Sequence, residues 1–67
     1  MKVIFNQDTT LELEEGTTVT KLLEIQGLKK EGVAVAVNEQ IVKKANFDDF
    51  KLTDGCSVDV FNMVSGG

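Results

Sequence analysis

The 67-residue sequence predicts an α+β fold, in which a mixed sheet of four to five strands packs on one short helix. Two observations predict this class. Alternation of apolar and polar residues, as in strands, occupies both ends of the chain and its middle, whereas residues 17–27 carry apolar side chains at helical spacing. A chain of this length buries only about 60% of its unfolded surface, so we expect one domain with one thin core.

The first two strands are expected at residues 1–5 and 10–14. In MKVIF, Val3 and Phe5 alternate with Ile4, and the turn-forming run NQDT follows. TLELE then has leucines on one face and polar residues on the other. This pattern predicts an N-terminal hairpin with one face in water.

A short helix is expected after the EEG stretch at residues 14–16. Its apolar residues fall at positions i, i+3 and i+4, namely Val19, Leu22 and Leu23. Thr17 or Thr18 can cap the start of this helix, and Gly27 suits the left-handed position after its end. Ile25 and Leu28 lie outside the apolar stripe, and we expect both to close the helix against the sheet.

The middle of the chain predicts a central strand followed by a short one. VAVAV at residues 33–37 has valines on one face and alanines on the other, and β-branched residues favour a strand over a helix. Asn38-Glu39 is a plausible tight turn into a short strand around Ile41 and Val42. Apolar side chains without a clear period predict an irregular or single-turn segment at residues 45–52.

The last strand is expected at residues 57–64, after the turn-forming run TDG. The inward face of SVDVFNMV holds Val58, Val60 and Val64. Phe61 and Met63 then project outward, and Ile4 on the neighbouring first strand is expected near them. An exposed apolar patch of this type indicates a docking surface for a partner protein. The alternative is that loops or residues 45–52 cover it.

The predicted order is strand, strand, helix, strand, short strand, strand. A hairpin, a crossover helix and three later strands resemble the β-grasp fold, in which the first and last strands pair side by side in the middle of a mixed sheet. The right-handed crossover rule favours that arrangement. We expect residues 1–64 to form this domain. Residues 65–67, SGG, offer no apolar side chain to pack, so a flexible C-terminal tail is expected there.

The charge of the chain disfavours several functions. Eleven acidic residues against seven lysines give a net charge of -4, and the chain has no histidine. Nucleic acid is therefore not expected as a partner, and the basic pairs Lys29-Lys30 and Lys43-Lys44 are interpreted as solvated turns. Neither a leader nor an apolar run of membrane-spanning length is visible, so no membrane contact is predicted and we expect a cytoplasmic protein.

The side chains offer no catalytic set. Asp48-Asp49 is interpreted as a solvated loop pair, and the chain has no phosphate-binding glycine loop and no Ser/His/Asp set. Cys56 has no histidine or strong cation beside it in the sequence, so we expect a structural apolar residue. A single cysteine excludes an internal disulfide and an iron–sulfur site. We therefore predict no catalytic residue, no metal site and no cofactor bound by the protein itself.

The chemical handle of the SGG ending is the terminal carboxylate of Gly67. A carboxylate becomes a good electrophile only after conversion to a mixed anhydride. Gly66 and Gly67 bring no Cβ atoms into the narrow active site of an activating partner, which suits such a reaction. The alternative interpretation is a frayed end without a function.

Several motifs together resemble the thiamine-biosynthesis sulfur carrier proteins over essentially the whole chain. They are MKVIFN at the start, GTTVTKLLE at the helix, VAVAVNEQIV in the middle, DG before the last strand and the terminal SGG. The Gly-Gly ending is shared with molybdopterin synthase small subunits and ubiquitin-like modifiers, whereas NEQIV and the short length favour the thiamine branch. Lys43 stands where many relatives have proline.

The resemblance implies a carrier and substrate rather than an enzyme. It implies that a ThiF-like adenylating enzyme, using ATP and Mg²⁺, activates the carboxylate of Gly67. A sulfur donor such as a cysteine desulfurase then supplies sulfur through a persulfide, and a ThiG-like thiazole synthase takes it from the resulting thiocarboxylate. The expected docking residues are Phe61, Met63, Ile4 and Ser65. Two rival hypotheses remain: a carrier for molybdopterin or transfer-RNA thiolation, and an interaction module with an inert tail.

Overall fold

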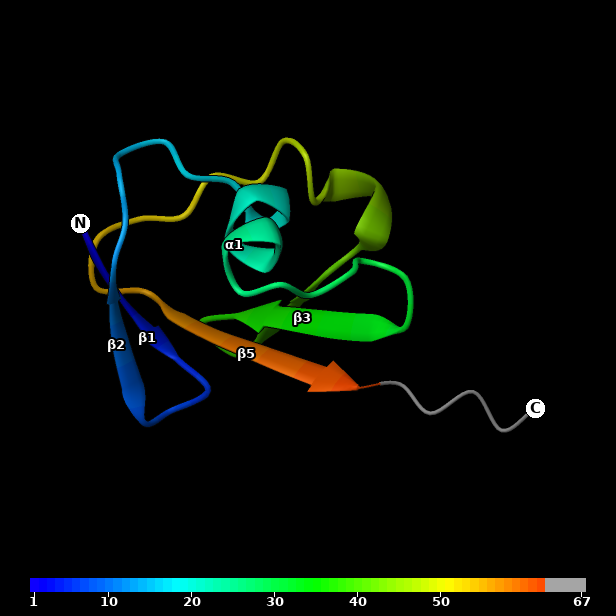
Figure 1. Ribbon diagram of the computed structural model, residues 1–67, viewed down its shortest axis with the longest axis horizontal. Coiled ribbons are helices and arrows are strands. Elements are labelled where there is room, and N and C mark those ends of the chain that lie inside the picture. The colour runs from blue at the N-terminus through cyan, green and yellow to red at the C-terminus, as the bar shows by residue number, and fades with distance from the viewer. Residues whose placement is uncertain (63–67) are drawn as a thin grey trace.

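One α-helix packs against one face of a five-stranded mixed sheet (Figure 1). The computed structural model describes residues 1–62. The elements in chain order are β1 (Lys2–Phe5), β2 (Thr9–Glu12), α1 (Val19–Ile25), β3 (Val33–Val37), β4 (Gln40–Val42), the 3-10 helix η1 (Lys44–Asn46) and β5 (Ser57–Asn62). Within this part of the chain, no helix is long and apolar enough to cross a membrane.

The strand order β2-β1-β5-β3-β4 confirms the predicted β-grasp arrangement. β1 and β5 pair in parallel, and the other three neighbouring pairs are antiparallel. The first and last strands of the described chain therefore lie side by side in the interior of the sheet, while β2 and β4 form its edges. The predicted second strand begins one residue earlier than expected, because Thr9 already pairs with Phe5.

The core lies between α1 and the sheet. Its fully buried side chains come from both layers and from the irregular segment after β4: Val3, Val19, Leu22, Leu23, Val35, Phe47 and Val58. Burial of one such side chain contributes about 1.5–3 kcal/mol. A domain of this size has a total stability of only roughly 3–10 kcal/mol, so each of these side chains matters to the fold.

The ends of α1 follow the local sequence signals. The Thr18 side chain accepts a hydrogen bond from the backbone N–H of Lys21 at 3.2 Å, which caps the N-terminus. Gly27 follows the helix with φ 72°, the left-handed conformation that glycine adopts at low cost. Leu28 packs against the core as predicted. The prediction for Ile25 was wrong: its side chain is 53% exposed, because it lies off the buried stripe of the helix.

Two hairpin turns share an unusual backbone conformation. Asn6-Gln7 joins β1 to β2 and Asn38-Glu39 joins β3 to β4, and in each turn φ is 51° at the asparagine and 70° at the next residue. Positive φ at both central positions matches the right-handed twist of the flanking strands, and asparagine tolerates it better than most side chains. The turn predicted at Asn38-Glu39 is confirmed.

Candidate functional site

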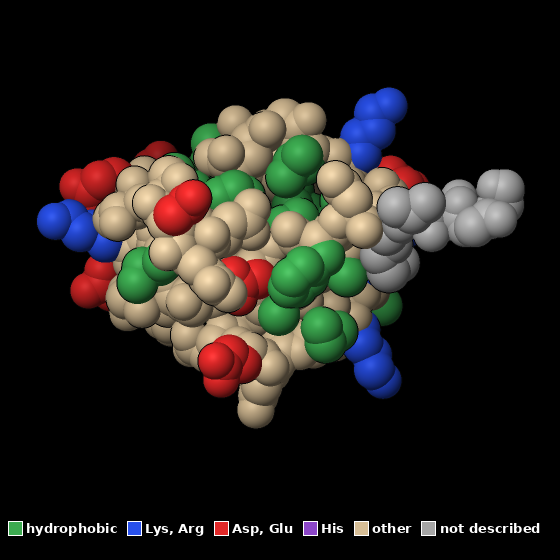
Figure 2. Space-filling view, turned by 90° about the horizontal axis from the view of Figure 1, so that it is seen from below, with side chains coloured by type: hydrophobic (Ala, Val, Ile, Leu, Met, Phe, Trp, Pro, Cys, Tyr) green, Lys and Arg blue, Asp and Glu red, His purple; other side chains and the backbone are tan. Residues whose placement is uncertain are grey.

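The sheet face opposite α1 is open, and hydrophobic side chains gather on it (Figure 2). The two most exposed large apolar side chains of this sheet face are Ile41 on β4, at 68%, and Phe61 on β5, at 51%. Between them lie Ala34, which is paired with Phe61, and Ala36, which is paired with Ile41. These four residues are named here the outer patch. Because the alanine side chains are short, the phenyl and isoleucine side chains stand above their neighbours.

The outward direction of Phe61 is confirmed, and no loop covers it among the described residues. The predicted closeness of Ile4 was wrong. Ile4 is 40% exposed, but it pairs with Ser57, four residues before Phe61 on β5. At about 3.3 Å per residue, the two side chains are separated by about 13 Å along the strand. The second large apolar residue of the outer patch, besides Phe61, is therefore Ile41 and not Ile4.

Sequence reasoning missed Ile41 although a signal for it existed. The two-residue turn at Asn38-Glu39 pairs Val37 with Gln40, and therefore Ala36 with Ile41. Counting back from this turn puts Ile41 and the alanines on one face. Counting along β5 then brings Phe61 to the same face through its partner Ala34.

The end of β5 is held by fewer strands than its beginning. β1 pairs with β5 only at Ile4 and Phe5, whereas β3 pairs with β5 as far as Asn62. Asn6 extends the contact on the β1 side: its backbone N–H donates to the Val58 carbonyl and its side-chain oxygen accepts from the Val60 N–H, both at 2.8 Å. Beyond this clamp, β3 is the one strand neighbour that the described residues provide.

The remaining predicted site residues, Met63, Ser65, Gly66 and Gly67, lie outside the described residues, as does Val64. The tail predicted for residues 65–67 lies there too. What the structure does define is the strand that leads toward them. β5 carries Phe61 on the open face and runs next to β3 up to Asn62.

Cys56 lies in the hydrophobic core, with 3% of its surface exposed. Its backbone carbonyl accepts a hydrogen bond from the N–H of Ile4 at 2.9 Å, which starts the parallel pairing of β1 with β5. This burial agrees with the structural interpretation of the cysteine. Across residues 1–62, no group of three or more metal-ligating side chains is close enough to hold a metal ion.

The pair Asp48-Asp49 lies on an exposed loop, as expected. Asp48 has local partners: it accepts a hydrogen bond from the Thr20 hydroxyl, and its carboxylate is 3.9 Å from the ammonium of Lys30. These contacts tie the loop to the start of α1. They account for Asp48 without a catalytic role.

Known proteins are similar to this chain in sequence and in fold. The chain matches the ThiS family over residues 2–67. The sulfur carrier protein ThiS of Escherichia coli is 33% identical over 67 residues, which is 100% of both chains. The sulfur carrier protein ThiS of Thermus thermophilus is 38% identical over 53 residues, covering 79% of this chain and 83% of the relative.

A solved structure agrees with these sequence relatives. The crystal structure of the thiamine biosynthesis protein ThiS from Geobacter metallireducens has a TM-score of 0.84 to this chain at 28% identity, with 100% of both chains covered. An NMR structure of a thiamine biosynthesis protein from the same organism has a TM-score of 0.78, covering 100% of this chain and 88% of the other. Fold, sequence and family match coincide over the same residues, and this chain belongs to the ThiS family.

Proposed function

We propose that this protein carries sulfur for thiazole formation in thiamine biosynthesis, with the carboxylate of Gly67 as the carrying group. The observation that carries the proposal is the family match through residue 67, which includes the SGG ending. Two relatives that share a third or more of their aligned residues with this chain are named sulfur carrier protein ThiS. In this proposal the protein is a carrier and substrate in the cytoplasm, and its partners are the catalysts.

The proposed chemistry begins at an adenylating enzyme of the ThiF type. A carboxylate oxygen of Gly67 attacks the α-phosphate of ATP, with Mg²⁺ in that enzyme, and pyrophosphate leaves. A persulfide formed by a donor such as a cysteine desulfurase displaces AMP from the mixed anhydride, and a thiol cleaves the resulting S–S bond. The product is a thiocarboxylate, which delivers its sulfur to a ThiG-like thiazole synthase.

The outer patch is the proposed docking surface for the adenylating enzyme. It combines an exposed aromatic ring with an exposed branched aliphatic side chain, and its aromatic residue, Phe61, lies on β5, the strand that precedes the tail in sequence. Aromatic side chains on an apolar patch are typical of the centres of protein interfaces. Ile4, Met63 and Ser65 remain proposed contacts of the adenylating enzyme.

Intact-mass measurement tests the proposed function. The protein is incubated with the adenylating enzyme, MgATP and a cysteine desulfurase with cysteine, and the expected product has one oxygen atom replaced by sulfur. A variant that lacks Gly67 keeps the folded body and should show no mass change. An unmodified mass for the complete chain, under conditions in which a known substrate of the same enzymes is converted, would contradict the proposal.

The same assay separates the pathways. The thiocarboxylate product is offered to thiazole synthase, to the large subunit of molybdopterin synthase and to a transfer-RNA thiolation enzyme. Sulfur transfer to thiazole synthase alone is the expected result. Transfer to one of the other two acceptors instead would assign the carrier to that pathway.

A further inference from the structure

A notch interrupts the sheet where β4 ends. Val35 of β3 pairs with Val42, the last residue of β4, and the two residues before Val35 have no β4 partner. Continuing the register would pair Ala34 with residue 43 and Val33 with residue 44, but η1 begins at Lys44 and takes the chain out of the sheet. A hollow of about 240 Å³ lies at this position.

At the notch, β3 continues past the end of β4, and Val33 has no β4 partner. The N–H of Asn38 donates to the carbonyl of Ser57 on β5, so the even-numbered residues of β3 turn their backbone groups toward β5. The odd-numbered residues turn theirs toward β4. Val33 therefore directs its N–H and carbonyl into the notch, at a point where β4 no longer continues. Unpaired strand backbone of this kind is a template for another extended segment.

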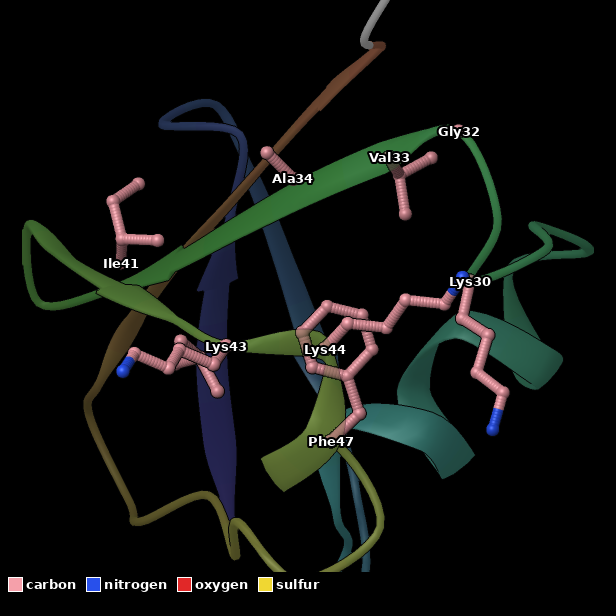
Figure 3. A pocket seen from close by; sticks show the side chains of 9 residues that line it. Lys30, Gly32, Val33, Ala34, Ile41, Lys43, Lys44 and Phe47 are labelled. Carbon is pink, nitrogen blue, oxygen red and sulfur yellow. The ribbon is translucent and has the colours of Figure 1, made fainter.

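The walls of the notch are apolar and its rim is cationic (Figure 3). The lining residues are Lys30, Gly32, Val33, Ala34, Ile41, Val42, Lys43, Lys44 and Phe47. Figure 3 shows the side chain of Lys44 crossing the ring of Phe47 toward Lys30, whereas the side chain of Lys43 points away from that ring. Three of the seven lysines of a chain with net charge -4 line this hollow, and no carboxylate is among its described lining residues.

The rim lysines are available to an incoming anion. The ammonium of Lys30 is 3.9 Å from Asp48 and that of Lys44 is 3.9 Å from Glu31, and these lysine side chains are 40% and 54% exposed. Exposed ion pairs at such a distance contribute little to stability, so an added carboxylate can replace them at small cost. Charge complementarity at the notch thus favours an acidic ligand.

We propose that the notch binds an extended acidic segment of a partner protein, in which apolar and acidic residues alternate. The segment continues the line of β4, forms backbone hydrogen bonds with Val33, inserts an apolar side chain beside Phe47 and directs its carboxylates to Lys30, Lys43 and Lys44. This binding site is separate from the chemistry of Gly67. It goes beyond the proposed function, and its outcome does not depend on sulfur transfer.

Nuclear magnetic resonance with a defined probe tests the proposal. The ¹⁵N-labelled full chain is titrated with a blocked heptapeptide of alternating glutamate and valine. We expect saturable shifts of the amide signals of residues 33–34 and 42–47. A peptide of alternating lysine and valine, and one of alternating glutamate and serine, should each bind at least about tenfold more weakly, because the first lacks the charge and the second the apolar contact.

Matched charge reversals locate the binding. Lys43→Glu together with Lys44→Glu should weaken binding of the acidic peptide at least about tenfold. Lys2→Glu together with Lys51→Glu changes the net charge equally, and it should have a much smaller effect because neither residue lines the notch. Thermal unfolding of both variants, and amide spectra that retain the native pattern, keep the comparison valid.

Three results would overturn the proposal. The first is the absence of shifts at millimolar peptide, and the second is an equal loss of binding in both double variants, which would indicate unspecific charge attraction. The third is self-association in sedimentation velocity that the acidic peptide abolishes. It would assign the notch to the acidic edge strand β2 of a second copy, whose sequence TTLE continues as LEE.

Discussion

Phe61 is exposed because its neighbours on the sheet are short. β1 has already ended at this level of β5, and the paired residue on β3 is Ala34. The ring therefore keeps about half of its surface in water, at 51%. Removing a half-exposed side chain costs far less stability than removing a core side chain, so its role in docking can be tested apart from the fold.

Phe61→Asp is expected to raise the KM of the adenylating enzyme for this carrier at least about tenfold, because a charge replaces a central aromatic contact of the interface. Its free energy of unfolding should fall by no more than about 1 kcal/mol, the range of strand preferences. Pyrophosphate release measures the first quantity and urea unfolding the second. Ile25→Asp is the matched control: Ile25 is equally exposed but lies on α1, so its KM should stay unchanged. Loss of cooperative unfolding in the Phe61 variant would show that the ring belongs to the core.

Cys56→Ser is expected to retain sulfur transfer while lowering the free energy of unfolding by about 1–3 kcal/mol, since a hydroxyl is then buried among apolar side chains. Cys56→Ala separates polarity from volume and should also transfer sulfur. The measurements are thiocarboxylate formation by intact mass and urea unfolding, at a temperature where both variants are folded. Absence of transfer in both folded variants, with adenylation intact, would mean that the thiol takes part in the reaction.

For the strands, the sequence predicted on which face of the sheet a side chain lies. It did not predict which residue of a neighbouring strand lies beside that side chain. Alternation predicted that Val3 faces inward and Phe61 outward, because side chains in a strand alternate strictly. It carries no information on the register of two strands that are far apart in sequence, and the Ile4 prediction failed for that reason. Where a two-residue turn fixes the register, as between β3 and β4, counting from the turn would have given Ala36 as the partner of Ile41, although this pairing was not predicted from the sequence. The exposure of Ile25 has a different cause. An amphipathic helix buries only the side chains of one face, and Ile25 lies outside that face.

Asn6→Gly is expected to release the end of β5. Glycine preserves the positive φ of the turn but removes the side-chain oxygen that accepts from Val60 N–H. The free energy of unfolding should fall by about 0.5–1.5 kcal/mol, the net value of one hydrogen bond. The amide of Val60 should exchange with deuterium faster, while the Val58 amide inside the sheet stays protected.

Two variants at the same turn control for backbone effects. Gln7→Gly alters the other positive-φ position and should leave Val60 exchange unchanged. Asn6→Asp keeps an acceptor oxygen and should restore most of the protection. Equal exchange at Val60 in the asparagine and glycine proteins would show that the clamp does not hold this strand end.

In the whole molecule, the stabilising layer is separate from the two proposed contact surfaces. α1 covers one face of the sheet (Figure 1). The residues of the outer patch lie on the other face, and the notch lies at the β4 edge. The sequence predicted the two-layer arrangement because the spacing of apolar residues changes from strand-like to helical in one segment only, and is strand-like again after it. It did not predict the notch, which depends on where β4 stops relative to β3 rather than on any residue type.

Addition of one alanine after Gly67, or Gly66→Val, is expected to abolish or severely slow adenylation with a stability change within about 0.5 kcal/mol. The added residue moves the carboxylate by about 3.3 Å, when misplacement by about 1 Å can cost about a hundredfold in rate. Valine introduces a branched side chain where glycine has none. Pyrophosphate release with the adenylating enzyme decides the matter, and unchanged rates for both variants would favour an interaction module with an inert tail.

The parallel pairing of β1 with β5 has a consequence for biosynthesis. The two strands are the first and last of the described chain, and β5 also holds β3. High contact order of this kind slows folding, because a long loop must close before its contacts form. On the ribosome, residues 1–56 lack the strand that joins the two halves of the sheet. An interrupted chain therefore cannot assemble Phe61, Ala34 and Ile41 into one surface, so the proposed docking of a partner there would require that synthesis has passed β5.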